Sequence, residues 1–130
     1  MKKSFWRLTV RSEFAAAHAL RHYQGKCEAM HGHNFSVEAV VQGDTLTPDT
    51  ELLVDFSELK RDLAGVLAAL DHKNLECVPP FDRINPSSEN LSRYIFRHLA
   101  PLVRERRAQL YAVTVSERAI QSATYMECEE

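Results

Sequence analysis

The sequence predicts an α+β fold whose elements follow the order ββααββ, and three observations support this. Two segments near the N-terminus alternate apolar with polar residues, which is the pattern of half-buried strands. Two later segments repeat apolar residues at helical spacing, and two short alternating segments follow them. The 130 residues, 45% hydrophobic and 26% charged, are enough for one buried core, so we expect a single domain over 1–130.

The first two predicted strands carry histidines on their apolar side. In residues 5–18 every second residue lies on the apolar side, and the last of these is His18. In "HGHNFSVEAVVQGD" the apolar side begins with His31 and His33. Residues 19–30 would form a loop between the two strands. Because such a loop joins strands that pair antiparallel, His18 is expected to lie close to His31 and His33.

Two helices are expected to follow. Asp55, with a glutamate three residues later, resembles a capping box and opens an apolar repeat that runs up to Asp71. Ser87 or Ser88 can cap the second helix, in which Pro101 is expected to bend or end the helical pattern.

The closing segments "QLYAVTVSE" and "SATYMEC" read as a pair of strands separated by "RAIQ". Simple alternation places Glu117 on the same face as Tyr111 and the valines between them. A carboxylate on an apolar face needs a partner. The ordinary alternative is an exposed charge just before the turn.

Composition excludes several classes of protein. A formal net charge of -2 lacks the basic excess that nucleic-acid backbones require, so no nucleic-acid partner is expected. No stretch approaches the ~20 apolar residues of a membrane span, and "MKKSFWRLTV" alternates unlike a signal peptide. We therefore expect a cytoplasmic protein without a membrane partner. Its three cysteines, an odd number, are expected to be reduced thiols.

His18, His31 and His33 together offer three nitrogen donors, the number typical of catalytic zinc, where a fourth position stays open. Imidazole also suits iron, copper and nickel. Any one of these histidines alone could be an ordinary strand residue satisfied by hydrogen bonds, but three on one apolar face favour a metal. His22 and His98 lack this context and are expected to be solvated or to pack.

Cys27 lies four residues before His31 and has two possible roles. It can fold back as a fourth ligand and close a structural site. Alternatively it stands near the metal, where the cation lowers the pKa of the thiol so that it can move protons.

Taken together, "FAAAH", C-x3-H-G-H, "LDHKNL", "PSSENL" and "TVSE" resemble the 6-pyruvoyl-tetrahydropterin synthase superfamily, from Phe14 to Glu117. The match is closest to its 6-carboxy-tetrahydropterin synthase branch, which acts in queuosine (7-deazapurine) biosynthesis. The resemblance implies the tunnelling fold, a four-stranded antiparallel sheet with two helices on one face. It also implies ring-like homo-oligomers, usually hexamers, with active sites at subunit interfaces.

The resemblance further implies a zinc-dependent lyase that converts 7,8-dihydroneopterin triphosphate to 6-carboxy-5,6,7,8-tetrahydropterin, acetaldehyde and triphosphate. A carboxylate beside an imidazole can orient it as an acid or base, although a helix terminus would explain the same pair. The implied roles are zinc, one per subunit, on His18, His31 and His33; a catalytic Cys27; a catalytic pair of Asp71 and His72; and a pterin site at Glu117 with Ser88.

The three residues between Cys27 and His31 are typical of the carboxy-forming branch, whereas 6-pyruvoyl-forming members usually have a longer spacing. Formation of 6-pyruvoyl-tetrahydropterin and an aldolase-like cleavage remain alternatives within the superfamily. A non-enzymatic zinc-binding or pterin-binding module is the alternative from another class.

Overall fold

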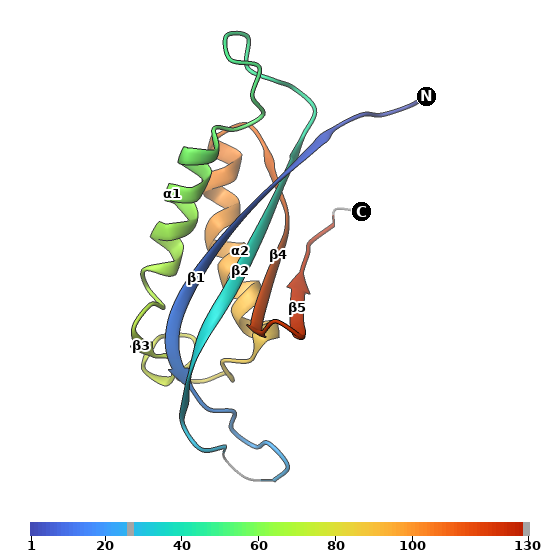
Figure 1. The fold of residues 1–130 in the computed structure, drawn as a ribbon. Coiled ribbons are helices and arrows are strands. Elements are labelled where there is room, and N and C mark those ends of the chain that lie inside the picture. Colours follow the sequence, from blue (N-terminus) through green and yellow to red (C-terminus); the bar gives the residue numbers. More distant parts are fainter. Residues whose placement is uncertain (26–27, 129–130) are drawn as a thin grey trace.

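The computed structural model describes residues 1–25 and 28–128 and has an α+β architecture. A twisted sheet forms one layer, and both helices pack on one face of it (Figure 1). The predicted class and the placement of the two helices are therefore confirmed.

Strands β1 (Trp6–His18) and β2 (His31–Gly43) form a long antiparallel hairpin. Their register is continuous and places His18 opposite His31. The apolar parity predicted from the sequence is buried from Val10 to His18 and from Phe35 to Val41. The two predicted strands are confirmed, and so is their inward face over these residues.

Strands β4 (Gln109–Arg118) and β5 (Gln121–Tyr125) complete the other side of the sheet. The pairing of β4 with β2 shifts by one residue, because Ala112 lies opposite Val40 while Leu110 lies opposite Val41. Tyr111 is the extra residue of this β-bulge. The expectation that Tyr111 shares the apolar face was wrong, since the guanidinium carbon of Arg7, on the outer side, lies 3.7 Å from its ring centroid.

The sheet has five strands in the order β3-β1-β2-β4-β5, so the expected four-stranded antiparallel sheet was incomplete. The additional strand, β3 (Lys73–Asn74), is two residues long and pairs parallel to the end of β1. It arises where the chain returns from the first helix and lies beside Ala16 and Ala17. Two residues are too few to show an alternating pattern, so this strand could not be predicted from residue periodicity.

Helix α1 (Phe56–Leu67) begins as predicted, with the side chain of Asp55 accepting a hydrogen bond from the backbone N–H of Ser57. It ends earlier than expected, and a turn occupies the residues up to Asp71. Leu70 in that turn is still fully buried, which explains why the apolar repeat continued past the end of the helix.

Helix α2 (Ser88–Glu105) follows the short 3-10 helix η1 (Leu75–Cys77), and Ser87 is its cap. Pro101 does not end the helix, which continues to Glu105. Leu99 and Val103, on either side of the proline, are both fully buried. Packing of this face against the sheet stabilises the last turn despite the missing backbone donor.

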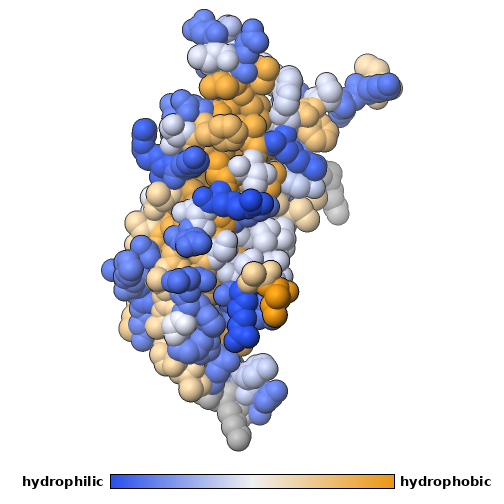
Figure 2. Space-filling view, viewed as in Figure 1, coloured by the Kyte–Doolittle hydropathy of each residue, from blue (hydrophilic) through white to orange (hydrophobic). Residues whose placement is uncertain are grey.

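The core lies between the sheet and the two helices and includes Phe14, Phe35, Leu63, Leu99 and Val115. In the space-filling view, hydrophilic side chains are spread over the visible face among areas of apolar surface (Figure 2). Within the described part of the chain, no helix combines the length and apolarity needed to span a membrane.

Candidate metal centre

Three histidines meet at one end of the sheet, where β1 ends and β2 begins. One nitrogen from each of His18, His31 and His33 lies within 4.8 Å of the other two. Their rings stand edge-on to one another, with centroids 4.7 Å apart for His18–His31 and 4.6 Å for His31–His33. The alternation of both strands and their register bring these side chains together, as predicted. The cluster can therefore hold a metal ion.

His18 is the buried member of the cluster, with 1% of its surface exposed. Its Nδ1 lies 2.9 Å from the backbone carbonyl oxygen of Pro86. A carbonyl only accepts, so Nδ1 carries the hydrogen of this bond. The other ring nitrogen, Nε2, is buried and has no hydrogen-bond partner among the residues that the structure describes. A buried polar atom without a partner is costly, and a metal ion bound to Nε2 would satisfy it.

His31 and His33 complete the cluster from β2. The Nδ1 of His31 lies 2.9 Å from the carbonyl oxygen of Ala29, which again leaves Nε2 available. The pKa of His33 is lowered, first by burial and next by the neighbouring His18, while the nearby carboxylate of Glu117 opposes this effect. Metals bind neutral imidazole, so a lowered pKa of His33 favours the form that binds a metal at neutral pH.

Glu117 and Ser88 lie beside the histidines. Glu117 alternates with the buried Val113 and Val115 and so faces the inner side of β4, where the hydroxyl of Ser88 donates to its Oε1 over 3.2 Å. The other oxygen, Oε2, is 3.7 Å from Nε2 of His33. The side chain of Glu117 is 22% exposed, so this carboxylate remains accessible to a ligand beside the metal cluster. Ser88 and His33 are therefore the partners of this carboxylate within the chain.

Asp71 and His72 occupy a different position, at the edge of the sheet. The side chain of Asp71 accepts from the backbone N–H of Ala15 over 2.9 Å, and the backbone N–H of His72 donates to the carbonyl of Ala15 over 2.6 Å. The imidazole of His72 is 82% exposed, with Nε2 3.6 Å from Asp71. It lines an open depression of about 500 Å³ that His33 also lines. Among the described residues, no hydrogen bond or ion pair joins this pair to the three histidines.

Cys27 lies outside the described residues, so its two possible roles remain predictions. The described residue after it, Glu28, is held to the end of β1 by two hydrogen bonds with Leu20, at 2.8 and 3.2 Å. His22 and His98 are exposed and lie outside the cluster, and Nδ1 of His98 contacts the carbonyl oxygen of Tyr94.

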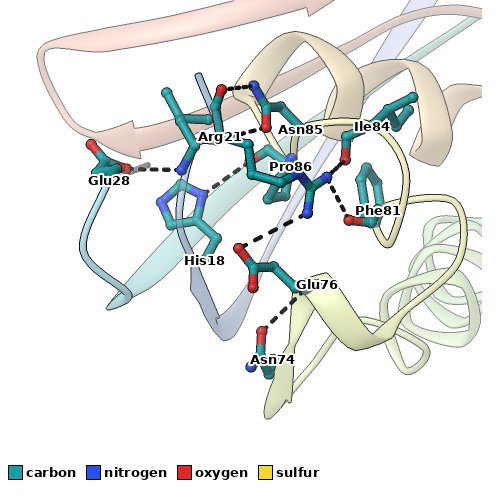
Figure 3. A network of polar contacts seen from close by, with 10 residues as sticks. His18, Arg21, Glu28, Asn74, Glu76, Phe81, Ile84, Asn85 and Pro86 are labelled. Atoms are coloured by element: carbon teal, nitrogen blue, oxygen red, sulfur yellow. Dashed lines mark hydrogen bonds and ion pairs between the residues drawn. The ribbon is translucent and has the colours of Figure 1, made fainter. Parts of the chain in front are cut away.

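Sequence reasoning missed the residues that support His18 from behind. Pro86 supplies its carbonyl, and Arg21 and Asn85 join the segment before α2 to the end of β1 (Figure 3). These contacts link side chains to backbone groups in irregular segments, where residue periodicity carries no information. The motif "PSSENL", which begins at Pro86, was the available sign that this segment has a role at the site. Capping of the second helix explained the motif almost as well.

Comparisons with known proteins agree with this geometry. Residues 7–128 match the family described as "6-pyruvoyl tetrahydropterin synthase". A 6-carboxy-5,6,7,8-tetrahydropterin synthase of Synechocystis sp. is 33% identical over 124 residues, which cover 92% of this chain and 92% of that protein. A dihydroneopterin monophosphate aldolase of Pyrococcus furiosus is 37% identical over 89 residues, covering 68% of this chain and 70% of that protein.

The fold has a counterpart among solved structures. That of 6-pyruvoyl tetrahydropterin synthase from Caenorhabditis elegans superposes with a TM-score of 0.80, covering 98% of this chain and 99% of that one. The two sequences are 24% identical, so this similarity shows the fold alone.

Proposed function

The chain belongs to the 6-pyruvoyl tetrahydropterin synthase family, and from that premise we propose that it is a zinc-dependent lyase of 7,8-dihydroneopterin triphosphate. Water is consumed, and the products are 6-carboxy-5,6,7,8-tetrahydropterin, acetaldehyde and triphosphate, a step of queuosine biosynthesis. The observation that carries the proposal is the buried Nε2 of His18, which has no hydrogen-bond partner among residues 1–25 and 28–128 and lies in a cluster of three histidines.

We propose that His18, His31 and His33 hold one zinc ion per subunit. A bound zinc ion would supply Lewis-acid chemistry, which would make protons beside a substrate oxygen easier to remove. The hydrogen bonds of His18 to Pro86 and of His31 to Ala29 leave Nε2 of each ring available for the ion. This is the usual arrangement of metal-binding histidines.

Glu117 is the proposed anchor for the pterin ring. The 2-amino group and the adjacent ring N–H of a pterin form a pair of donors, and one carboxylate can accept both. Glu117 is partly exposed and lies next to His33, so a ring held there would place its side chain near the histidines. Ser88 already donates to one oxygen of this carboxylate and fixes its orientation.

Cys27 and the Asp71–His72 pair are proposed to move protons at the carbons of the substrate side chain. His72 is 82% exposed and lies apart from the cluster, so we propose that the active site is completed in a homo-oligomer, a hexamer by the family resemblance. Pairing of sheet edges between subunits would also satisfy the open backbone groups of a small sheet. In such an assembly the imidazole would be covered and could take part in catalysis.

The choice of product rests on two observations. The Synechocystis relative that matches over 92% of this chain is a 6-carboxy-5,6,7,8-tetrahydropterin synthase, and three residues separate Cys27 from His31. A thiol held by a loop of another length meets a different carbon of the substrate, and about 1 Å of displacement can change rates about a hundredfold. Aldolase-like cleavage is the second candidate, favoured by the 37% identity to the Pyrococcus furiosus protein.

The test is to incubate the zinc-loaded protein with 7,8-dihydroneopterin triphosphate and identify the products by mass spectrometry, with acetaldehyde trapped as a hydrazone. Equal amounts of acetaldehyde and 6-carboxy-5,6,7,8-tetrahydropterin are expected. Formation of 6-pyruvoyl-tetrahydropterin without acetaldehyde would contradict the branch, and release of 6-hydroxymethyl-7,8-dihydropterin together with glycolaldehyde triphosphate would identify the aldolase. A zinc-replete protein that releases none of these would contradict the proposed activity.

A further inference from the structure

The hydrogen bond between His18 and Pro86 joins two segments that are far apart in the sequence. Pro86 is buried immediately before Ser87, the cap of α2, and belongs to no helix or strand. Its carbonyl oxygen receives the Nδ1 hydrogen of His18 over 2.9 Å. The position of this irregular segment therefore decides which nitrogen of His18 faces the other two histidines.

Arg21 and Asn85 hold that segment in place (Figure 3). The backbone N–H of Arg21 donates to Oδ1 of Asn85 over 2.8 Å, and Nδ2 of Asn85 donates to the carbonyl of Arg21 over 2.9 Å. The amide side chain thus pairs with one backbone unit as a neighbouring strand would. Arg21 is three residues after His18 and Asn85 directly precedes Pro86, so this clamp lies next to the His18–Pro86 bond.

The guanidinium group of Arg21 adds further contacts to the same segment. Its Nη2 donates to the carbonyl oxygens of Phe81 and Ile84, at 2.9 and 2.5 Å. The carbonyl of Asn85 in turn accepts from the side chain of Asn90 in α2, over 2.9 Å. The side chain of Arg21 is 24% exposed, and its bond to Phe81 and the Asn85–Asn90 bond are partly buried, whereas its bond to Ile84 is exposed. The segment before α2 is therefore fixed from both sides.

We propose that Arg21 and Asn85 are positioning residues for the metal centre. They hold the carbonyl of Pro86 against Nδ1 of His18, which keeps the hydrogen on Nδ1 and Nε2 directed to the metal. Partners behind a metal-binding histidine commonly change metal affinity about 10- to 100-fold when they are removed. The inference rests on the proposed zinc site, but its first measurement needs no metal.

The test uses Asn85→Ala and Arg21→Ala, with Asp55→Ala and Arg106→Ala as controls. Asp55 caps α1, and Arg106 joins α2 to Asp62 of α1, so both controls remove side-chain bonds away from the clamp. Histidine-selective ¹⁵N NMR of the metal-free protein reports which nitrogen of His18 carries the hydrogen. Competition with a chromophoric chelator gives the Kd for Zn²⁺, and the visible absorption of bound Co²⁺ reports coordination geometry.

Both clamp variants are expected to lose the preference for hydrogen on Nδ1 of His18, raise the Kd for Zn²⁺ about 10- to 100-fold and alter the Co²⁺ spectrum. The controls are expected to lower thermal stability. Their hydrogen position on His18, their Kd for Zn²⁺ and their Co²⁺ spectrum should stay at wild-type values. If Arg21→Ala does not fold, Arg21→Lys loses the fork-shaped contact to two carbonyls and retains the backbone bonds to Asn85, so a smaller effect in the same direction is expected.

Wild-type values in the folded clamp variants would overturn the inference, as would equal changes in the two controls. A wild-type protein that binds no Zn²⁺ would instead contradict the proposed function. The NMR measurement would still decide whether Arg21 and Asn85 position His18.

Discussion

Replacing Glu117 with glutamine tests the proposed pterin site with little change of shape. Glutamine keeps one oxygen for the hydroxyl of Ser88 but presents an NH₂ group where the substrate needs a second acceptor. The wild-type side chain is only 22% exposed, so water cannot fully replace the lost interaction. A hydrogen bond to a charged group contributes about 1.5–3 kcal/mol. Since 1.36 kcal/mol is a factor of ten, kcat/KM should fall about 10- to 150-fold.

The assay is steady-state turnover of 7,8-dihydroneopterin triphosphate, together with zinc content and unfolding in urea. Zinc content should stay at the wild-type level, because Glu117 is not one of the three proposed ligands. The free energy of unfolding should change by less than about 1 kcal/mol, because the bond to Ser88 can persist. Glu89→Gln, an exposed change in the first turn of α2, is the matched control and should keep full activity. If kcat/KM of Glu117→Gln stayed within twofold of wild type, the proposed anchor would be wrong.

Three further predictions address the metal, the thiol and the core. His31→Ala should lower zinc far below one per subunit by elemental analysis, whereas His98→Ala, on the exposed side of α2, should keep it; wild-type zinc in His31→Ala would refute the ligand set. Cys27→Ala should keep zinc and lose turnover, and loss of both with the fold intact would identify the thiol as a fourth ligand. Phe35→Ala should lower the free energy of unfolding by about 3–5 kcal/mol, because the ring is fully buried and stacked 4.8 Å from Phe14. A loss below about 1 kcal/mol in urea would show that this packing is not required.

The histidine cluster was predictable because its geometry follows from strand alternation alone. Once residues 5–18 and 31–44 are paired as antiparallel strands, His18 must face the same side as His31 and His33. The cap of α1 at Asp55 was predictable for a similar reason, since its hydrogen bond reaches only two residues along the chain. Both features depend on spacing within one element or one hairpin.

Features that depend on contacts between distant segments were not predictable. The parallel strand β3 exists only because the turn after α1 returns beside the end of β1. The contact between Arg21 and Asn85 spans 64 residues and joins a side chain to backbone groups, which no periodic pattern encodes. The helix does not end at Pro101 because burial of the α2 face outweighs the local penalty of proline, and burial becomes visible only in the folded chain.

The bulge in β4 makes this strand tolerant of a length change at one position. Leu110, Val113 and Val115 all face inward, although the first two are three residues apart. Removing either Tyr111 or Ala112 would leave one residue between Leu110 and Val113, so that Leu110 and Glu117 keep their faces, whereas removing Thr114 would turn one part of the strand inside out. Single-residue deletions among relatives are therefore expected at the position of Tyr111 or Ala112, with the carboxylate beside the metal centre unaffected.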